Sequence, residues 1–595
     1  MRATASAIFL VLTALMAALW SMPSHSASAA RKDHKKQTQE EEPVRVIIEG
    51  VDDALRKQIE LTLSLQQLAG EQPTQARLQR LYAKAPQEIR ESLRPFGYYD
   101  VTVSSSMKKK SQRFVYRFHV DPGPRVHMEQ IHVTINGPGE ENELLQKTRS
   151  AFPLKKDAPL EHAKYDQGKE ALLDMAMQEG YLDATYTTSR LEVDPARRLA
   201  TVNLELRTGK RYRMGPVTIR QEILKPSLVR QYIPFQEGDP YQTSKLLDLK
   251  YALDDSGYFR SVTVAPERGK TEGDTVPIMV STEPAKRNLY TAGIGFGTDS
   301  GPRGSLGWKD RYLNEKGHTL RIDGATSLID THLTADYRIP IPPPTTDSLS
   351  LNGGLQQQDV DDRKSLKGTA GIGLLRSHGP WQRSMRINYE YERYKIGEQD
   401  TEQAALLLPG LGWTYMDSDK APIMRRGLRI DTDIRGAAKW LASDLDFLRL
   451  YAKAKWVQGL WPSGRMLLRA ESGANLTSRL AQVPLSQRFF AGGDQSVRGY
   501  DFQKLGPKDD DGNVTGGRYL MAGSAELEQR AWKNLGVAAF FDMGDAFNSF
   551  DTSLKRAVGA GLRFHTPVGV ARLDVARTIA TEPSWRVHIT FGPDL

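Results

Sequence analysis

One arginine in a glycine-rich stretch is the side chain of this sequence best placed for charge chemistry. Arg498 lies within residues 488–500, between two segments that alternate apolar and polar residues, and the stretch is too long for a hairpin turn. Gly492, Gly493 and Gly499 permit tight backbone turns around it. A guanidinium held in such a loop pairs best with a carboxylate, because its planar fork can donate two hydrogen bonds to it. The stretch therefore predicts either a structural ion pair or a charged reaction site.

Residue patterns typical of enzymes are absent from the 595-residue sequence. It contains no Gly-x-Ser-x-Gly elbow, no His-Glu-x-x-His motif and no phosphate-binding glycine loop. The sequence has no cysteine, which excludes a thiolate nucleophile, a cysteine metal site and a disulfide framework. The 11 histidines show no ligand spacing, and residues 509–513 lack the downstream glutamate of a calcium loop. We therefore expect a protein that is not an enzyme and has no metal or cofactor site.

The start of the sequence predicts export. Arg2 precedes an apolar run at residues 8–20, and residues 27–29 form a small-residue cleavage site. We interpret residues 1–30 as a secretory signal peptide rather than a retained anchor. Residues 31–43 are a charged, low-complexity linker with no apolar face to bury, which predicts disorder. The formal net charge of +9 is small for this length, so no nucleic-acid partner is expected.

A repeated pattern organises the sequence before residue 286. A Gly-Tyr pair recurs at Gly97, Gly180 and Gly257, where each pair ends a helical pattern and precedes two alternating strands. Each unit also opens with a short apolar strand, so its order is strand, helix, helix, strand, strand. This order predicts three small α+β domains. Their expected ranges are residues 44–122, 123–208 and 209–285.

The remaining residues, 286–595, predict a transmembrane β-barrel. Along residues 385–392, apolar and aromatic side chains alternate with polar and charged ones. This period of two fits strands with one face toward lipid and the other toward a wet lumen, whereas a soluble β-sandwich would bury fewer charges. Such segments number about 16, an even number as in single-chain bacterial barrels. No long apolar run follows the N-terminal segment, which argues against membrane-spanning helices.

The repeated units resemble polypeptide-transport-associated (POTRA) domains, and the barrel resembles the superfamily of outer-membrane assembly and two-partner-secretion barrels. The resemblance of the barrel rests on residues 490–500 and on a Phe-x-Asp-x-Gly pattern in a following strand. In that superfamily the loop folds back into the lumen, and its arginine pairs with the aspartate of that pattern. The resemblance implies a structural pairing here, which we call the lumenal latch. Its expected residues are Arg498, Gly499, Tyr500, Glu526, Phe540 and Asp542.

The two strands that must close the barrel both show features that weaken strand pairing. Residues 290–297 carry glycine at three alternate positions, and glycine specifies register poorly. Residues 585–591 are short and precede a Gly-Pro pair, in which proline removes a hydrogen-bond donor. We interpret this junction as a weak seam that can part toward lipid; glycines that only make room in a tight lumen are the alternative. The seam residues are Gly293, Gly295, Gly297, Val587, Ile589, Gly592 and Pro593.

Three POTRA-like units, the barrel entry at residues 293–303 and the ending at 591–595 resemble the TamA type of this superfamily, the outer-membrane subunit of a translocation and assembly module. The resemblance implies a barrel in the outer membrane of a Gram-negative bacterium and POTRA domains in the periplasm. It implies help in inserting unfolded outer-membrane proteins, such as autotransporters, through exposed POTRA strand edges and the weak seam.

The same resemblance implies two further partners. One is a TamB-like protein anchored in the inner membrane, and the other is outer-membrane lipid. Two alternative functions stay open at this point: a bridge for phospholipid transport with the TamB-like partner, and a dedicated two-partner-secretion channel. A barrel-anchored enzyme is disfavoured because no catalytic set of residues is present.

Overall fold

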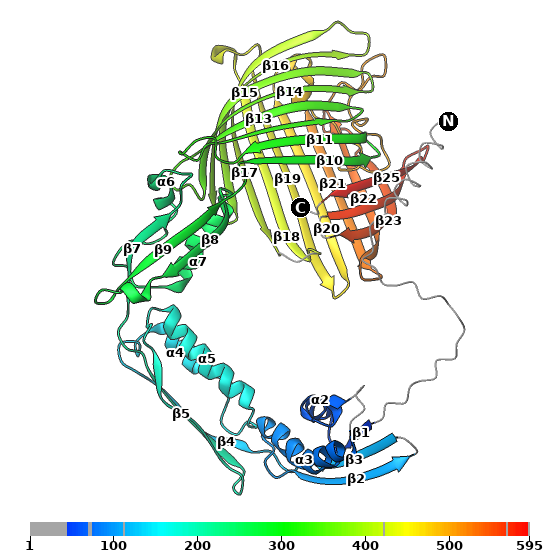
Figure 1. Cartoon of the computed structure of the whole chain (residues 1–595). Helices are drawn as coiled ribbons and strands as arrows, with labels where there is room; N and C mark the ends of the chain where they lie inside the picture. Colours follow the sequence, from blue (N-terminus) through cyan, green and yellow to red (C-terminus); the bar gives the residue numbers. More distant parts are fainter. Residues whose placement is uncertain (1–43, 69–73, 111–112, 420–422, 567–568, 593–595) are drawn as a thin grey trace. The chain divides into compact units, whose positions relative to one another are not determined.

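The computed structural model describes residues 44–68, 74–110, 113–419, 423–566 and 569–592 (Figure 1). The predicted signal peptide, the predicted linker and Pro593 lie outside the described residues. Before the barrel, three small α+β domains follow one another, each with the predicted order of strand, two helices and two strands. This part of the fold prediction is confirmed.

The first domain contains β1 (Val44–Glu49), α2 (Asp53–Thr62), α3 (Gln75–Leu93), β2 (Thr102–Lys110) and β3 (Arg113–Asp121). The second contains β4 (His127–Asn136), α4 (Glu143–Ser150), α5 (His162–Gln178), β5 (Thr185–Asp194) and β6 (Leu199–Arg207). The third contains β7 (Arg213–Arg220), α6 (Pro226–Arg230), α7 (Thr243–Asp255), β8 (Phe259–Pro266) and β9 (Thr275–Pro284). In each sheet the last strand lies in the centre, so the first and second strands form the edges.

Each small domain has its own apolar core, because one face of its helices packs on the sheet. In the first domain α3 buries Ile89 and Leu93, which share a core with Phe118 of β3. The Thr74 side chain accepts a hydrogen bond from the Arg77 amide and so caps the start of α3.

The repeated Gly-Tyr pairs form the joints between consecutive domains. Gly97, Gly180 and Gly257 have φ values of +86°, +92° and +74°, the left-handed conformation predicted for a glycine that ends a helix. The carbonyl oxygen of Gly97 accepts a hydrogen bond from the Val126 amide, and that of Gly180 accepts one from the Tyr212 amide. The glycine that ends the last helix of one domain therefore also binds the backbone that begins the next domain.

An arginine repeats at the same joints. Arg125 Nε donates to the carbonyl oxygen of Phe96 at 3.0 Å, and its guanidinium carbon lies 5.4 Å from the Tyr98 ring centroid. Arg211 Nε likewise donates to the carbonyl oxygen of Glu179 at 2.9 Å, and its guanidinium lies 5.8 Å from the following tyrosine ring, that of Tyr181. Each arginine thus satisfies a carbonyl group at the helix end and also lies within cation–π range of the tyrosine.

Sixteen strands form one antiparallel sheet in which each strand pairs with the next, and the sheet curls into a barrel (Figure 1). This confirms the predicted barrel. The first eight strands are β10 (Asn288–Gly297), β11 (Gly301–Asp310), β12 (Thr319–Thr326), β13 (Asp330–Pro340), β14 (Asp347–Val360), β15 (Arg363–His378), β16 (Trp381–Ile396) and β17 (Glu402–Ser418). The second eight are β18 (Arg426–Ala437), β19 (Phe447–Trp461), β20 (Gly464–Leu476), β21 (Tyr519–Arg530), β22 (Leu535–Phe547), β23 (Lys555–Thr566), β24 (Gly569–Ile579) and β25 (Trp585–Gly592).

The two faces of the barrel differ in polarity as the sequence pattern predicts. On β16 the side chains of Met385 and Ile387 are exposed on the outside, whereas Glu390 and Glu392 are buried inside. The apolar outside suits lipid, and the charged inside suits a wet or hydrogen-bonded lumen. Among the described residues, no helix is long and apolar enough to cross a membrane.

The third domain is bonded to the β11–β12 connection of the barrel. The Tyr258 hydroxyl donates to the Gly317 carbonyl oxygen at 2.6 Å, and the Lys225 amide donates to that of Glu315. Arg311 Nη1 also donates to the Gly257 carbonyl oxygen, at 3.3 Å. Burial raises the pKa of Tyr258 to about 12, so its hydroxyl stays protonated and available as a donor. These bonds identify the end of the barrel to which the third domain is attached.

Candidate functional site in the barrel lumen

The connection between β20 and β21, residues 477–518, folds into the barrel rather than away from it. Phe489, Ala491 and Val497 are buried there. Two arginines of the barrel wall hold its first half: the guanidinium of Arg449 lies 4.5 Å from the ring centroid of Phe489, and that of Arg363 lies 4.2 Å from the ring centroid of Phe490. Cation–π contacts of this kind gain strength when both groups are shielded from water.

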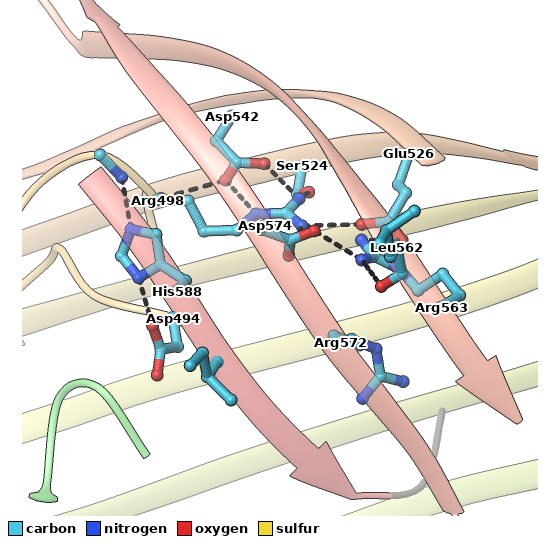
Figure 2. A network of polar contacts seen from close by, with 12 residues as sticks. Asp494, Arg498, Ser524, Glu526, Asp542, Leu562, Arg563, Arg572, Asp574 and His588 are labelled. Atoms are coloured by element: carbon cyan, nitrogen blue, oxygen red, sulfur yellow. Dashed lines mark hydrogen bonds and ion pairs between the residues drawn. The ribbon is translucent and has the colours of Figure 1, made fainter. Parts of the chain in front are cut away.

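Arg498 binds Asp542 through three nitrogen atoms (Figure 2). Its amide and its Nε donate to Asp542 Oδ2 at 3.0 and 2.7 Å, and its Nη2 donates to Oδ1 at 2.9 Å. The side chain of Arg498 is 3% exposed and that of Asp542 is 0% exposed. The arginine and the aspartate of the Phe-x-Asp-x-Gly strand therefore form a buried, bidentate ion pair.

Further acceptors use the remaining hydrogen atoms of the same guanidinium. Nη1 donates to Glu526 Oε2 at 2.8 Å and to Asp574 Oδ2 at 3.0 Å, and Nη2 donates to Ser524 Oγ at 3.1 Å. The guanidinium carbon lies 3.4 Å from the ring centroid of Phe540, which closes one face of it. Arg498 thus bonds groups of β21, β22 and β24, and this contact set fixes where the loop lies.

A second arginine balances the carboxylates around Arg498. Arg563 of β23 donates to Glu526 Oε1 through Nε at 2.9 Å and Nη2 at 2.7 Å, and its Nη1 donates to Asp574. Glu526 and Asp574 each lie between the two guanidinium groups (Figure 2). Because each of the three buried carboxylates contacts at least one buried guanidinium, the network is a stable arrangement rather than one poised to exchange protons.

Gly499 and Tyr500 complete the predicted latch. Gly499 has φ of +95°, and a Cβ atom there would lie 3.3 Å from side-chain atoms of Ala557 and Thr578, so a larger residue would be strained and crowded. The Tyr500 hydroxyl donates to the Arg556 carbonyl oxygen at 3.5 Å, a long hydrogen bond. The six residues expected at the lumenal latch therefore lie together on the loop and the wall beside it.

The seam between β10 and β25 contains few direct hydrogen bonds. In the described part of the chain, no ladder joins these two strands, although all other neighbouring strands of the barrel are paired. The residue that follows β10 makes the direct contact: the Thr298 amide donates to the Ile589 carbonyl oxygen at 3.4 Å, and the Ile589 amide donates to Thr298 Oγ1 at 3.2 Å. This pair fixes the antiparallel register of the two edges.

The register leaves most of β10 beyond the end of β25. Counting three residues along each strand from the Thr298–Ile589 pair places Gly592, the last residue of β25, opposite Gly295. The earlier residues of β10, Asn288 to Ile294, are all exposed, and Ile294 is 98% exposed. Among the described residues, none pairs with this edge of β10 in the half nearest the third domain, so that half presents an unpaired strand edge.

The predicted seam residues lie on two faces of these edges. Val587 and Ile589 point outward on β25 and are exposed. An added Cβ would lie 2.6 Å from Ser305 Oγ at Gly293 and 2.8 Å from the Arg303 side chain at Gly295. At these two positions glycine also makes room for side chains of β11, which is the packing role named as the alternative.

Comparison with known proteins adds family matches to this geometry. Residues 312–592 match the Omp85 superfamily domain. Residues 45–122 match the POTRA domain described as TamA domain 1, and residues 212–284 match the surface antigen variable number repeat, a POTRA model. The barrel is an Omp85 superfamily barrel with POTRA domains.

Outer membrane protein assembly factors are among the relatives of the chain. The chain is 23% identical over 509 residues to the assembly factor BamA of Nitratidesulfovibrio vulgaris, covering 80% of this chain and 62% of that protein. It is 20% identical over 533 residues to BamA of Neorickettsia risticii, covering 83% and 70%. The chain thus spans less than two thirds of the first of these relatives.

A solved structure shares the fold. BamA from Haemophilus ducreyi lacking POTRA domains 1–3 aligns with a TM-score of 0.66 and 17% identity, covering 78% of this chain and 99% of that one. The Omp85 barrel therefore lies in the outer membrane, and its POTRA domains lie in the periplasm. The named relatives are outer membrane protein assembly factors, which agrees with the expectation of a protein that is not an enzyme.

Three members of the Arg498 network were missed from the sequence. Ser524, Arg563 and Asp574 occupy inward-facing positions of β21, β23 and β24. Many inward-facing positions of an Omp85 barrel are polar, so alternation alone does not tell which of them meet. Ser524 had the clearest signal, because it precedes Glu526 by two residues and so lies on the same face of the strand.

Proposed function

We propose that this protein is the outer-membrane subunit of a translocation and assembly module of the TamA type, and that it assists the insertion of outer-membrane proteins such as autotransporters. The match of residues 45–122 to a TamA-type first POTRA domain supports this type. The presence of three POTRA-like sheets also supports it, because three such units are part of the resemblance to the TamA type. The relatives named BamA support the broader activity of outer-membrane protein assembly.

The unpaired edge of β10 carries the proposal. Its exposed backbone groups can pair with a strand of an incoming protein, since an edge strand accepts any extended segment with little demand on sequence. The edge lies at the periplasmic end of the seam, close to the POTRA domain that binds the β11–β12 connection. A substrate strand that adds to β10 would widen the seam and pass sideways into lipid.

The POTRA sheets supply a second set of edges. In each sheet the first two strands are the outer ones, so β1 and β2, β4 and β5, and β7 and β8 each offer an edge for strand addition. We propose that unfolded substrates bind there first, and that a TamB-like protein anchored in the inner membrane binds the same periplasmic region. Phospholipid transport with that partner is the competing role.

A cross-link across the seam tests the role of the β10 edge. The chain has no native cysteine, so Phe296→Cys with Phe591→Cys places the only thiols at two exposed outer positions that the register sets opposite each other across the seam. We expect cells that carry the cross-linked protein to lose surface display of an autotransporter, and a reducing agent to restore it. Display that stays normal in the fully cross-linked protein would contradict the proposal.

A matched control uses two strands that never need to part. Val575 and Val587 face each other across the β24–β25 ladder and are both exposed to the outside. The Val575→Cys and Val587→Cys pair introduces the same chemistry beside the seam without bridging it, and should leave display unchanged.

Deletion of the protein separates insertion from lipid transport. Autotransporter display and the amount of phospholipid in the outer leaflet are measured in the same deletion strain. Loss of display with normal lipid asymmetry supports the insertion role. Disturbed lipid asymmetry with normal display would replace it with the lipid-bridge role.

A further inference from the structure

The lumenal loop contacts both edges of the seam as well as the Arg498 network. Asp494 lies four residues before Arg498 and accepts a hydrogen bond from Thr298 Oγ1 at 3.1 Å. The Asp494 amide donates to Asp299 Oδ2 at 2.6 Å, in the turn that follows β10. The Asp494 carboxylate also contacts His588 Nδ1 on β25 (Figure 2). One residue of the loop thus bridges the strand edges that no ladder joins.

The loop holds His588 at both ring nitrogens. The Gly499 amide donates to His588 Nε2 at 2.9 Å, so Nε2 must be the unprotonated, accepting nitrogen. The proton of the neutral ring therefore lies on Nδ1, which donates to Asp494. His588 is 1% exposed. The contact between β25 and the loop is accordingly a buried pair of directional hydrogen bonds.

The same donors and acceptors argue against a metal ion at this point. Asp299, Asp494 and His588 are close enough for one oxygen or nitrogen of each to hold a cation. A metal on Nδ1 of a neutral imidazole requires the proton on Nε2. The Gly499 amide already directs its hydrogen at Nε2, so the two hydrogen atoms would collide. The arrangement fits a hydrogen-bonded contact and does not fit a metal site.

We propose that Asp494, with Thr298 and His588, forms a clasp that keeps the seam closed until the loop moves. The proposal rests on the proposed function, because it concerns how the same seam is opened. Arg498 anchors the loop to the strands away from the seam, and Asp494 extends from that anchor to both seam edges. Among the described residues, direct bonding between the edges is limited to the Thr298–Ile589 pair, so the clasp contributes a large share of the polar contacts that close the seam there.

The clasp can be removed without touching the anchor. Asp494→Ala deletes the carboxylate but keeps the backbone amide that donates to Asp299, and it leaves every contact of Arg498 in place. Thr298→Val removes the hydroxyl that donates to Asp494 and accepts from Ile589. Gln495→Ala, at the exposed neighbouring position of the same loop, is the matched control.

Distances across the seam report its opening directly. Spin labels on cysteines at Ile294 and Val587 lie on the outer face of the two edges and do not touch the clasp. The full chain in lipid nanodiscs is measured by pulsed electron paramagnetic resonance. For Asp494→Ala we expect the ratio of wide to narrow distances to rise about tenfold, as for the loss of a hydrogen bond to a charged group. Thr298→Val should act in the same direction. The effect of the double variant should be smaller than the sum of the single effects, because both variants remove the Thr298–Asp494 hydrogen bond, although each also removes one contact of its own, to Ile589 or to His588.

Control measurements identify the outcomes that would overturn the clasp. Labels at Leu527 and Leu562, on two strands of the closed ladder, should give the same distances in all variants and so show that the barrel is folded. Unchanged seam distances in Asp494→Ala and Thr298→Val would overturn the clasp. Narrowing of the wild-type distances on addition of zinc, reversed by a chelator, would overturn it in favour of a metal site.

The clasp and the proposed function can fail separately. If the variants leave the seam distances unchanged while the Phe296–Phe591 cross-link abolishes autotransporter display, the clasp is wrong and the function stands. If Asp494→Ala widens the seam while the cross-link leaves display normal, the clasp stands and the function is wrong.

Discussion

At the scale of single residues, Arg498 is placed to hold a loop in position rather than to carry out a reaction. Its guanidinium donates to Asp542, Glu526, Asp574 and Ser524, and Phe540 covers one of its faces. No hydrogen atom of the group remains for a substrate, and each buried carboxylate has a cationic partner. The loop is therefore fixed by a saturated set of charge-assisted bonds, which are directional and strong when buried.

Replacing this arginine should weaken the barrel strongly. Arg498→Ala leaves Asp542 buried without its bidentate partner, which costs about 3–5 kcal/mol for a buried pair. Arg498→Lys keeps the charge but cannot form the planar set of hydrogen bonds. We therefore expect its free energy of unfolding to lie between those of Arg498→Ala and the wild type. The free energy of unfolding is measured by urea titration of the protein in lipid bilayers.

An arginine on the barrel surface serves as the control. Arg393 of β16 is exposed, and Arg393→Ala should change the free energy of unfolding by less than about 0.5 kcal/mol. An Arg498→Ala variant as stable as Arg393→Ala would show that the lumenal latch does not stabilise the barrel.

The same residues show what the sequence could and could not predict. Arg498 and Asp542 both belong to recognisable local patterns, and their pairing followed from the resemblance of those patterns to a family. Asp494 lies in the same pattern as Arg498, but the resemblance gave it no partner, and His588 is 94 positions further along and belongs to no such pattern. Their contact depends on how the loop crosses the lumen, and that path is fixed by packing of Phe489 and Phe490 on distant strands.

At the scale of elements, the repeated Gly-Tyr pair and arginine mark each small domain in the sequence and also connect it to the next one in the structure. The sequence predicted the glycine cap from its position after a helical pattern, and the positive φ values confirm it. It did not predict that the arginine of the following segment binds that cap. The reason is physical: the arginine lies 29 positions from Phe96 in the first joint and 32 from Glu179 in the second, so the bond is not visible in local spacing.

Removing the joint arginine should loosen the backbone around it. In Arg211→Ala the carbonyl oxygen of Glu179 loses its donor and the Tyr181 ring loses its cation. We expect hydrogen exchange at the Tyr212 amide, which donates to Gly180, to become about tenfold faster, because one such hydrogen bond contributes roughly 1 kcal/mol or more. Hydrogen–deuterium exchange with mass spectrometry measures this change.

The neighbouring arginine provides the comparison. Arg213 donates to the Gly238 carbonyl oxygen inside the third domain and does not bind the glycine cap. Arg213→Ala should therefore leave exchange at Tyr212 close to that of the wild type. Equal exchange in Arg211→Ala and Arg213→Ala would show that the repeated arginine does not support the joint.

At the scale of the whole molecule, two kinds of stability occur in one chain. Each periplasmic domain has a separate apolar core, represented by Ile89 in the first and Val202 in the second. The barrel instead has an apolar outside, and buried ion pairs and cation–π contacts in its lumen. Burial of apolar surface from water stabilises the periplasmic domains, whereas ladder hydrogen bonds, lipid and the lumenal network stabilise the barrel.

Two spectroscopic signals should therefore report two different unfolding transitions. The α-helices of the described residues all precede the barrel, so helical circular dichroism follows the periplasmic domains. Of the nine tryptophans, only Trp20 precedes the barrel, and it lies in the predicted signal peptide. Tryptophan fluorescence thus follows the barrel alone. We expect the helical signal to be lost at a lower urea concentration than the fluorescence signal, since non-coincident transitions indicate units that unfold separately.

One variant in each region makes this prediction sharp. Ile89→Ala leaves a cavity in the core of the first domain and should lower the unfolding free energy of that domain by about 2–5 kcal/mol. Part of the circular dichroism transition should therefore move to lower urea, while the fluorescence transition stays in place. Arg498→Ala should shift only the fluorescence transition, because its partners all lie in the barrel. If either variant moved both transitions together, the periplasmic domains and the barrel would form one cooperative unit, and the lumenal latch would then stabilise domains that it does not touch.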